Sequence, residues 1–236
     1  GQHVSGAGDV ELSAYLPLAA ACAAFVGTHF LMSHPLRAML VYRLRGNGFS
    51  LLYSAVSLAL FYWMITAFVQ APKGNYFWPV GDVLWAITSI LTLIAAVLFT
   101  GSFVRNPALP GVPDALAAQE PACVFKVTRH PMMWGFALWG IGHILIAPRI
   151  DNFLFAGSIV FLALVGSKGQ EIKKKKLAGV EWDSWLRRTY FWPRLSALPS
   201  VGFGPWIAGI VLWLVATWGH PYLGVAGAGI FRWLGI

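Results

Sequence analysis

Residues 128–143 read TRHPMMWGFALWGIGH, a short polar start followed by an almost unbroken apolar run. Pro131 suits the first turn of a helix, where a missing backbone N–H costs nothing. A helix that is apolar on all sides belongs in a lipid bilayer or in the centre of a large protein. His143 lies inside this run. An ionisable side chain at membrane depth is costly, so it marks a candidate functional site.

The composition of the whole chain favours the bilayer. Of the 236 residues, 58% are hydrophobic and only 11% are charged, and the mean hydropathy is +0.66. A soluble domain carries about 25% charged residues. The sequence therefore predicts an integral, multi-pass membrane protein, which we expect in the bacterial inner membrane.

Six apolar runs are visible along the chain, at roughly 12–33, 50–69, 83–104, 132–147, 153–167 and 205–219. A spanning helix needs about 20 apolar residues, which the first three runs supply. The fourth and fifth runs are shorter and are joined by a tight polar turn, which indicates a helical hairpin. We predict an all-α polytopic membrane bundle of about six transmembrane helices, with residues 1–236 forming a single integral membrane domain. The Pro-rich loop 106–124 is expected to be a tether.

Basic residues in the loops predict the orientation of the bundle. If the N-terminus lies outside the cytoplasm, fourteen Lys and Arg residues fall on the cytoplasmic side and three fall outside. Cytoplasmic loops of membrane proteins carry such an excess of Lys and Arg. The three outside residues are Lys73, Arg149 and Arg232. We therefore expect both termini outside the cytoplasm.

Several classes of function lose support because their residues are missing. No Asp or Glu lies in the middle of an apolar run, which disfavours carboxylate proton relays and cation-coupled transport. No H-E-x-x-H or G-x-S-x-G motif is present. The net charge of +8 suggests anionic lipid headgroups, and we expect no binding of nucleic acid. No C-x-x-C-H motif is present, so any haem would be held without a covalent bond.

The histidines leave two interpretations open. On a helix, the face of His143 also carries Trp139 and Gly140, and this combination suits the wall of a site for a flat macrocycle. Imidazole at that depth ligates a metal or haem, relays protons, or hydrogen-bonds to a neighbouring helix. The alternative is simple helix packing, in which the glycines allow close approach. His29, late in the first run, is the other histidine within an apolar run.

Two His-Pro pairs are similarly ambiguous. His130 precedes Pro131 and either caps the fourth helix or, with Arg129, binds an anionic or nucleotide-like ligand at the membrane interface. His220 precedes Pro221 near the outer end of the last run, and the same alternatives apply.

Residues 168–193 combine basic and aromatic side chains at helical spacing. Lys173, Lys174, Lys175 and Lys176 form a basic run, and Trp182 and Trp185 follow on an apolar face. A basic amphipathic helix of this kind lies on the inner leaflet. We therefore expect the four lysines to bind anionic lipids of the bilayer.

The block from Val127 to His143 closely resembles the signature of the NnrU family, bacterial membrane proteins named from denitrification gene clusters, with the 15-cis-zeta-carotene isomerase as a relative. Thr28-His29, residues 53–58, Glu181-Trp182 and His220-Pro221 resemble further family segments, and the likeness covers about residues 20–223. What the resemblance implies is haem b bound by His29 and His143 and used in the redox-dependent cis–trans isomerisation of a lipophilic, carotenoid-like substrate. An accessory role in nitrogen-oxide metabolism, without catalysis, is the alternative, so whether the protein is an enzyme stays open.

Two departures from the isomerase and one geometric objection affect this inference. One departure is that the spacing between His29 and the Leu36-Arg37 pair differs by a residue. The isomerase has a cysteine three residues before its fourth-helix ligand, where this chain has Gly140. The expected topology also places His29 near the inner end of its helix and His143 farther out, an offset on the order of 10 Å at 1.5 Å per residue. Two axial ligands lie about 4 Å apart, so the topology favours His143 with His220 instead.

A more distant resemblance supplies another alternative. Arg129-His130-Pro131, Glu171 and the Trp-rich stretch after it resemble the membrane methyltransferases that use S-adenosylmethionine. Those enzymes usually have Tyr two residues after the Pro, where this chain has Met133.

The charge distribution yields a prediction about topology. Reporter fusions made after Lys176 should report the cytoplasm, and fusions after Lys73 should report the opposite side, because basic loops are retained inside. Paired alkaline phosphatase and fluorescent-protein fusions measure this. The reverse pattern would contradict the six-span arrangement.

Overall fold

The computed structural model describes residues 11–104, 106 and 119–236, and these form helices and connecting segments without a strand. Most of the loop expected to be a tether lies outside the described residues. The α-helices are α1 Leu16–Ser33, α2 Arg37–Gln70, α3 Asp82–Gly101, α4 Pro131–Ile146, α5 Ile150–Arg188, α6 Phe203–Gly219 and α7 Ile230–Leu234. The short 3-10 helices are η1 Leu12–Tyr15, η3 Cys123–Lys126, η4 Leu195–Ser200 and η5 His220–Leu223.

Each of the six apolar runs forms a helix. Five helices in the described part of the chain are long and apolar enough to cross a membrane, and α4 is a shorter apolar helix of 16 residues. Residues 147–149 join α4 to α5, where the sequence predicted a tight polar turn. The prediction of an all-α polytopic membrane bundle is confirmed.

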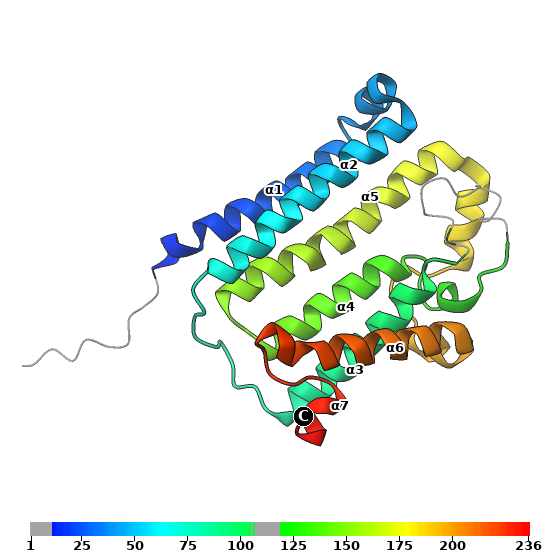
Figure 1. The fold of residues 1–236 in the computed structure, drawn as a ribbon. Coiled ribbons are helices and arrows are strands. Elements are labelled where there is room, and N and C mark those ends of the chain that lie inside the picture. Colours follow the sequence, from blue (N-terminus) through cyan, green and yellow to red (C-terminus); the bar gives the residue numbers. More distant parts are fainter. Residues whose placement is uncertain (1–10, 105, 107–118) are drawn as a thin grey trace, which may run out of the picture. The chain divides into compact units, whose positions relative to one another are not determined.

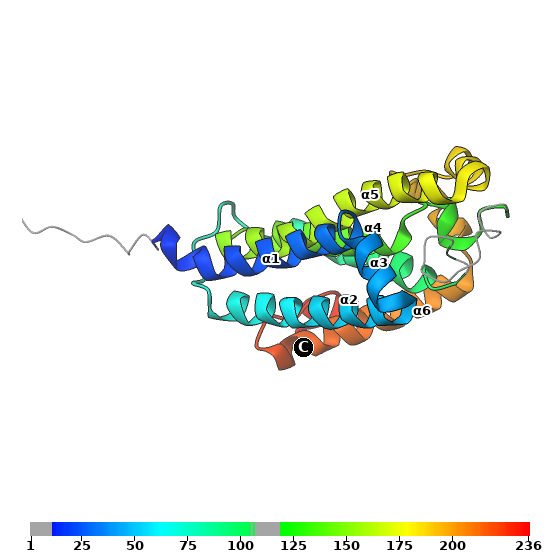
Figure 2. The same ribbon diagram turned by 90° about the horizontal axis from the view of Figure 1, so that it is seen from above.

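The chain forms two compact units, and α5 contributes to both. The first unit contains Gly1–Pro79 and Ala147–Ser158, and the second contains Val80–Ile146 and Ile159–Ile236. In the first, α1 and α2 pack side by side, as Figure 2 shows. Asp151, whose side chain is fully buried, accepts from Lys73 at 3.0 Å and from Arg149 at 3.0 Å. This buried carboxylate ties the loop after α2 to the start of α5.

In the second unit, α3 is the central helix, and α4 and α6 both pack against it (Figure 1). Glycines allow α4 and α6 to approach α3 closely. A Cβ added at Gly209 of α6 would lie 2.7 Å from the backbone of Val97, and one at Gly135 of α4 would lie 3.1 Å from the carbonyl oxygen of Ala95. Membrane helices associate through such small residues because lipid supplies no hydrophobic drive between them.

The basic segment differs from the prediction. Lys173–Lys176 lie within α5 itself, which continues to Arg188 through a kink at Gly179, where φ is +57°. Trp182 and Trp185 are 1% and 2% exposed and pack in the core with Phe125. The expectation that they form a lipid-facing surface is wrong, because the kink turns the end of α5 back onto the protein. The lysines remain candidates for contact with anionic lipids.

The close approach at Gly209 can be tested. Gly209→Ala should destabilise the protein by about 1–3 kcal/mol, because the added methyl group meets the α3 backbone and forces the two helices apart. Thermal unfolding in detergent measures this. Gly204→Ala on the same helix is the matched control, since no atom lies within 4 Å of its added Cβ. Equal stability of the two variants would contradict the tight α3–α6 contact.

Candidate functional site

Two histidine rings of the second unit face each other from different helices. His143 lies near the end of α4 and His220 directly follows α6. Their ring centroids are 6.3 Å apart and their planes differ by 20°. Because α4 and α6 pack on α3 and touch each other little, the two rings meet across the space between the helices.

Local hydrogen bonds orient both rings. Nδ1 of His143 lies 2.8 Å from the carbonyl oxygen of Trp139, and Nδ1 of His220 lies 2.7 Å from that of Ala216. A carbonyl oxygen only accepts, so we assign the hydrogen to Nδ1 and the lone pair to Nε2 in each ring. Metal-bound histidines show this arrangement, in which one ring nitrogen donates to a carbonyl and the other ligates.

The separation of the two ring centroids, 6.3 Å, is close to that of two imidazoles whose nitrogens ligate one iron. A metal–nitrogen bond of about 2 Å places the two near nitrogens about 4 Å apart, and hence the ring centroids about 6 Å apart. In the described residues, no three His, Cys, Asp or Glu side chains gather as a metal cage would require. Two imidazoles suit haem iron better than a metal ion held by protein side chains alone, because the macrocycle supplies the remaining ligands.

Trp139 and Gly140 were predicted to share the helix face of His143. The Trp139 ring is 4.2 Å from the His143 ring. Gly140 is buried on α4, and Gly142 approaches Thr88 of α3 so closely that an added Cβ would lie 3.0 Å from its methyl group. The close packing that glycine allows is therefore present on the same helix as the candidate ligand.

His29 has a different environment, in the first unit. Its Nδ1 lies 2.7 Å from the carbonyl oxygen of Phe25, and its Nε2 lies 3.3 Å from the Ser57 hydroxyl of α2. The Tyr53 ring lies 5.4 Å away. These contacts tie α1 to α2. Pairing of His29 with His143 stays a prediction, because the two residues belong to separate units.

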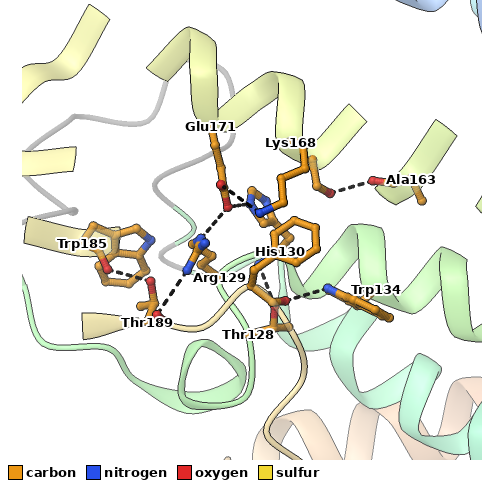
Figure 3. A network of polar contacts seen from close by, with 11 residues as sticks. Thr128, Arg129, His130, Trp134, Ala163, Lys168, Glu171, Trp185 and Thr189 are labelled. Carbon is orange, nitrogen blue, oxygen red and sulfur yellow. Dashed lines mark hydrogen bonds and ion pairs between the residues drawn. The ribbon is translucent and has the colours of Figure 1, made fainter. Parts of the chain in front are cut away.

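His130 lies far from the paired imidazoles. It precedes α4, so about 20 Å of helix separates it from His143. Its Nε2 lies 2.8 Å from Oε1 of Glu171 on α5, which also accepts from Nε of Arg129 (Figure 3). Nζ of Lys168 lies 3.8 Å from the other carboxylate oxygen. The structure thus joins Arg129, His130 and Glu171, the three residues that the methyltransferase resemblance had named.

Backbone contacts hold this network in place. Phe191 supplies a carbonyl oxygen that accepts from Thr128 and from the indole of Trp134, each at 2.8 Å. The amide of Arg129 donates to the carbonyl of Tyr190, and that of Arg194 donates to Val127, both at 2.8 Å. Hydrogen bonds therefore join the segment after α5, residues 190–194, to the residues just before and at the start of α4. The sequence did not predict these hydrogen bonds, because the bonded residues lie some 60 positions apart and carry no motif.

Burial sets the protonation state of His130. Removal from water lowers the pKa of His130, against the opposing effect of the Glu171 carboxylate. The ring is therefore neutral at pH 7, and Nε2, which faces an acceptor, carries the hydrogen.

Comparison with known proteins supplies one match. A family model described as NnrU protein matches residues 17–227. No curated protein and no solved structure matches the sequence.

The ion network makes a prediction about stability. Glu171→Gln should destabilise the protein by about 3 kcal/mol, because Arg129 would keep a charge in a largely buried position without its partner. Chemical or thermal unfolding measures the change. Glu120→Gln is the matched control, since Glu120 also pairs with an arginine, Arg188, but its side chain is 90% exposed. If both variants lose stability equally, Glu171 does not anchor the network.

Proposed function

The chain belongs to the NnrU family, and from this membership and the facing rings of His143 and His220 we propose an integral membrane protein that binds haem b without a covalent bond. The separation of the two ring centroids, 6.3 Å, is the observation that carries the proposal. His143 is the first ligand and His220 is its partner within the same unit. His29 is the partner that the carotene isomerase would imply.

Residues of the chain itself orient the two candidate ligands. The carbonyl oxygens of Trp139 and Ala216 hold the two rings in the tautomer that leaves Nε2 as the ligating nitrogen. The Trp139 ring beside His143 restricts rotation of the imidazole. A bound haem would supply a redox-active iron, the chemistry on which the related isomerase depends.

The apolar surroundings of the site support a lipophilic substrate. Both ligand-bearing helices are apolar, and on α6 Val215 and Trp218 are 61% and 52% exposed on the protein surface. Such a surface faces lipid, so a substrate would reach the site from within the bilayer. We propose a lipophilic, carotenoid-like substrate and a redox-dependent cis–trans isomerisation.

A spectrum tests the haem proposal. Protein purified from haem-replete cells should show a Soret band, and the haem should extract into acidified organic solvent. His143→Ala should abolish or strongly shift the low-spin spectrum, because the iron loses a strong axial nitrogen. His220→Ala should do the same if the pair described here binds iron, whereas His29→Ala should do so if the family pair does.

His34→Ala is the control for these variants, because His34 belongs to neither pair. It should leave the spectrum unchanged. Protein that stays colourless under these conditions, with normal yield and unfolding temperature, would overturn the proposal.

A second candidate has one observation in its favour. The contacts of Glu171 with Arg129 and His130 gather the residues expected of a methyltransferase that uses S-adenosylmethionine. Equilibrium binding of radiolabelled S-adenosylmethionine, lost in Arg129→Ala, would support that function. If neither haem nor S-adenosylmethionine binds, an accessory role in denitrification is the remaining alternative.

A further inference from the structure

The first turn of α4 leaves backbone donors unused. In the described part of the chain, the first amide of this helix with a backbone acceptor is that of Trp134, which donates to His130. Pro131 has no N–H, and the N–H groups of Met132 and Met133 have no acceptor there. Helix N-termini bind anions through such groups, aided by the helix dipole.

A cavity of about 40 Å³ opens at this turn. The cavity is lined by the residues before and in the first turn of α4 and by two polar residues from elsewhere in the chain: Arg129, His130, Pro131, Met132, Met133, Asn106 and Gln170. One buried water needs roughly 10–15 Å³ of such space, so the cavity has room for about three waters. A tetrahedral oxyanion has this size.

His130 places a requirement on the ligand that the amides of a helix end alone would not. Its side chain is 1% exposed, and its Nε2 is engaged by Glu171. Nδ1 makes no hydrogen bond among the described residues, and in the neutral ring it is an acceptor. A ligand that satisfies it must bring a hydrogen.

The local charge favours an anion. Arg129 and Lys168 together outweigh the single carboxylate of Glu171, and the dipole of α4 adds positive potential. The ligand must therefore carry negative oxygens for the two amides and also a hydroxyl group for Nδ1. Sulfate and carboxylate ions have no such hydroxyl at neutral pH, whereas a phosphate group with a P–OH has both.

We propose that the cavity at the start of α4 is a binding site for a phosphate group that carries a P–OH, either inorganic phosphate or the head of a phosphate monoester lipid. The site is separate from the paired imidazoles. Its oxygens would accept from the Met132 and Met133 amides, and its hydroxyl would donate to Nδ1 of His130.

Titration of the full chain in detergent with inorganic phosphate, followed by calorimetry, tests the site. Phosphate should bind saturably in the millimolar range or below. Sulfate should bind at least about tenfold more weakly, because Nδ1 would face an acceptor oxygen. Equal affinity for the two ions, or no saturable binding of phosphate, would overturn the proposal.

Variants separate the site from general attraction to a basic surface. Lys168→Gln should weaken phosphate binding severalfold, and Lys126→Gln, an exposed basic control, should not. His130→Phe keeps an aromatic ring but removes the acceptor, so the preference for phosphate over sulfate should disappear. Unfolding temperatures confirm that each variant is folded. If folded His130→Phe keeps the full preference, the role assigned to Nδ1 is wrong.

Lipid nanodiscs distinguish the two sources of phosphate. Phosphatidic acid has a monoester head, whereas phosphatidylglycerol is an anionic diester without a P–OH. Enrichment of phosphatidic acid around the protein, lost in Lys168→Gln, would identify the lipid head as the ligand. Saturable binding of inorganic phosphate without that enrichment would identify the free ion.

Discussion

The ion pair between Arg129 and Glu171 fixes the position of α4, and much of the second unit depends on it. Its side chains are 11% and 13% exposed, so neither charge is well solvated and each needs the other. The same carboxylate accepts a hydrogen bond from Nε2 of His130. Backbone hydrogen bonds between the residues before α4 and the segment after α5 lie next to it. A helix of only 16 residues gains a defined starting point in this way. Its distal end, with His143, is then placed against α3.

In the described part of the chain, three histidines make the same local bond, in which the ring N–H at Nδ1 donates to the carbonyl oxygen four residues earlier. That bond is a property of the helix and says little about function. The neighbours distinguish them, because Nε2 of His29 lies near a serine hydroxyl whereas the ring of His143 faces a second imidazole. His130 differs again, since a carboxylate holds its Nε2 and a cavity lies beside it. Similar side chains thus support helix packing, a proposed haem site and a proposed phosphate site.

Hydropathy predicted the helices well because membrane burial acts on every residue of a span. Two helices with a short connection were predicted from two apolar runs and the polar turn between them, and residues 147–149 do join α4 to α5. The environment of Trp182 and Trp185 was predicted wrongly. Their spacing is that of an amphipathic helix, and spacing is the same whether the apolar side meets lipid or protein. The kink at Gly179 decides between the two, and a glycine in a sequence does not reveal its φ angle.

The sequence alone determined the class of this protein, the number of its apolar helices and the candidate histidines. These follow from composition and periodicity, which are local properties of the chain. Only the tertiary structure decided that His143 faces His220, that Glu171 receives both Arg129 and His130, and that Phe191 accepts from Thr128 and Trp134. Such contacts join residues from 41 to 77 positions apart, and tertiary packing, rather than any short motif, sets them.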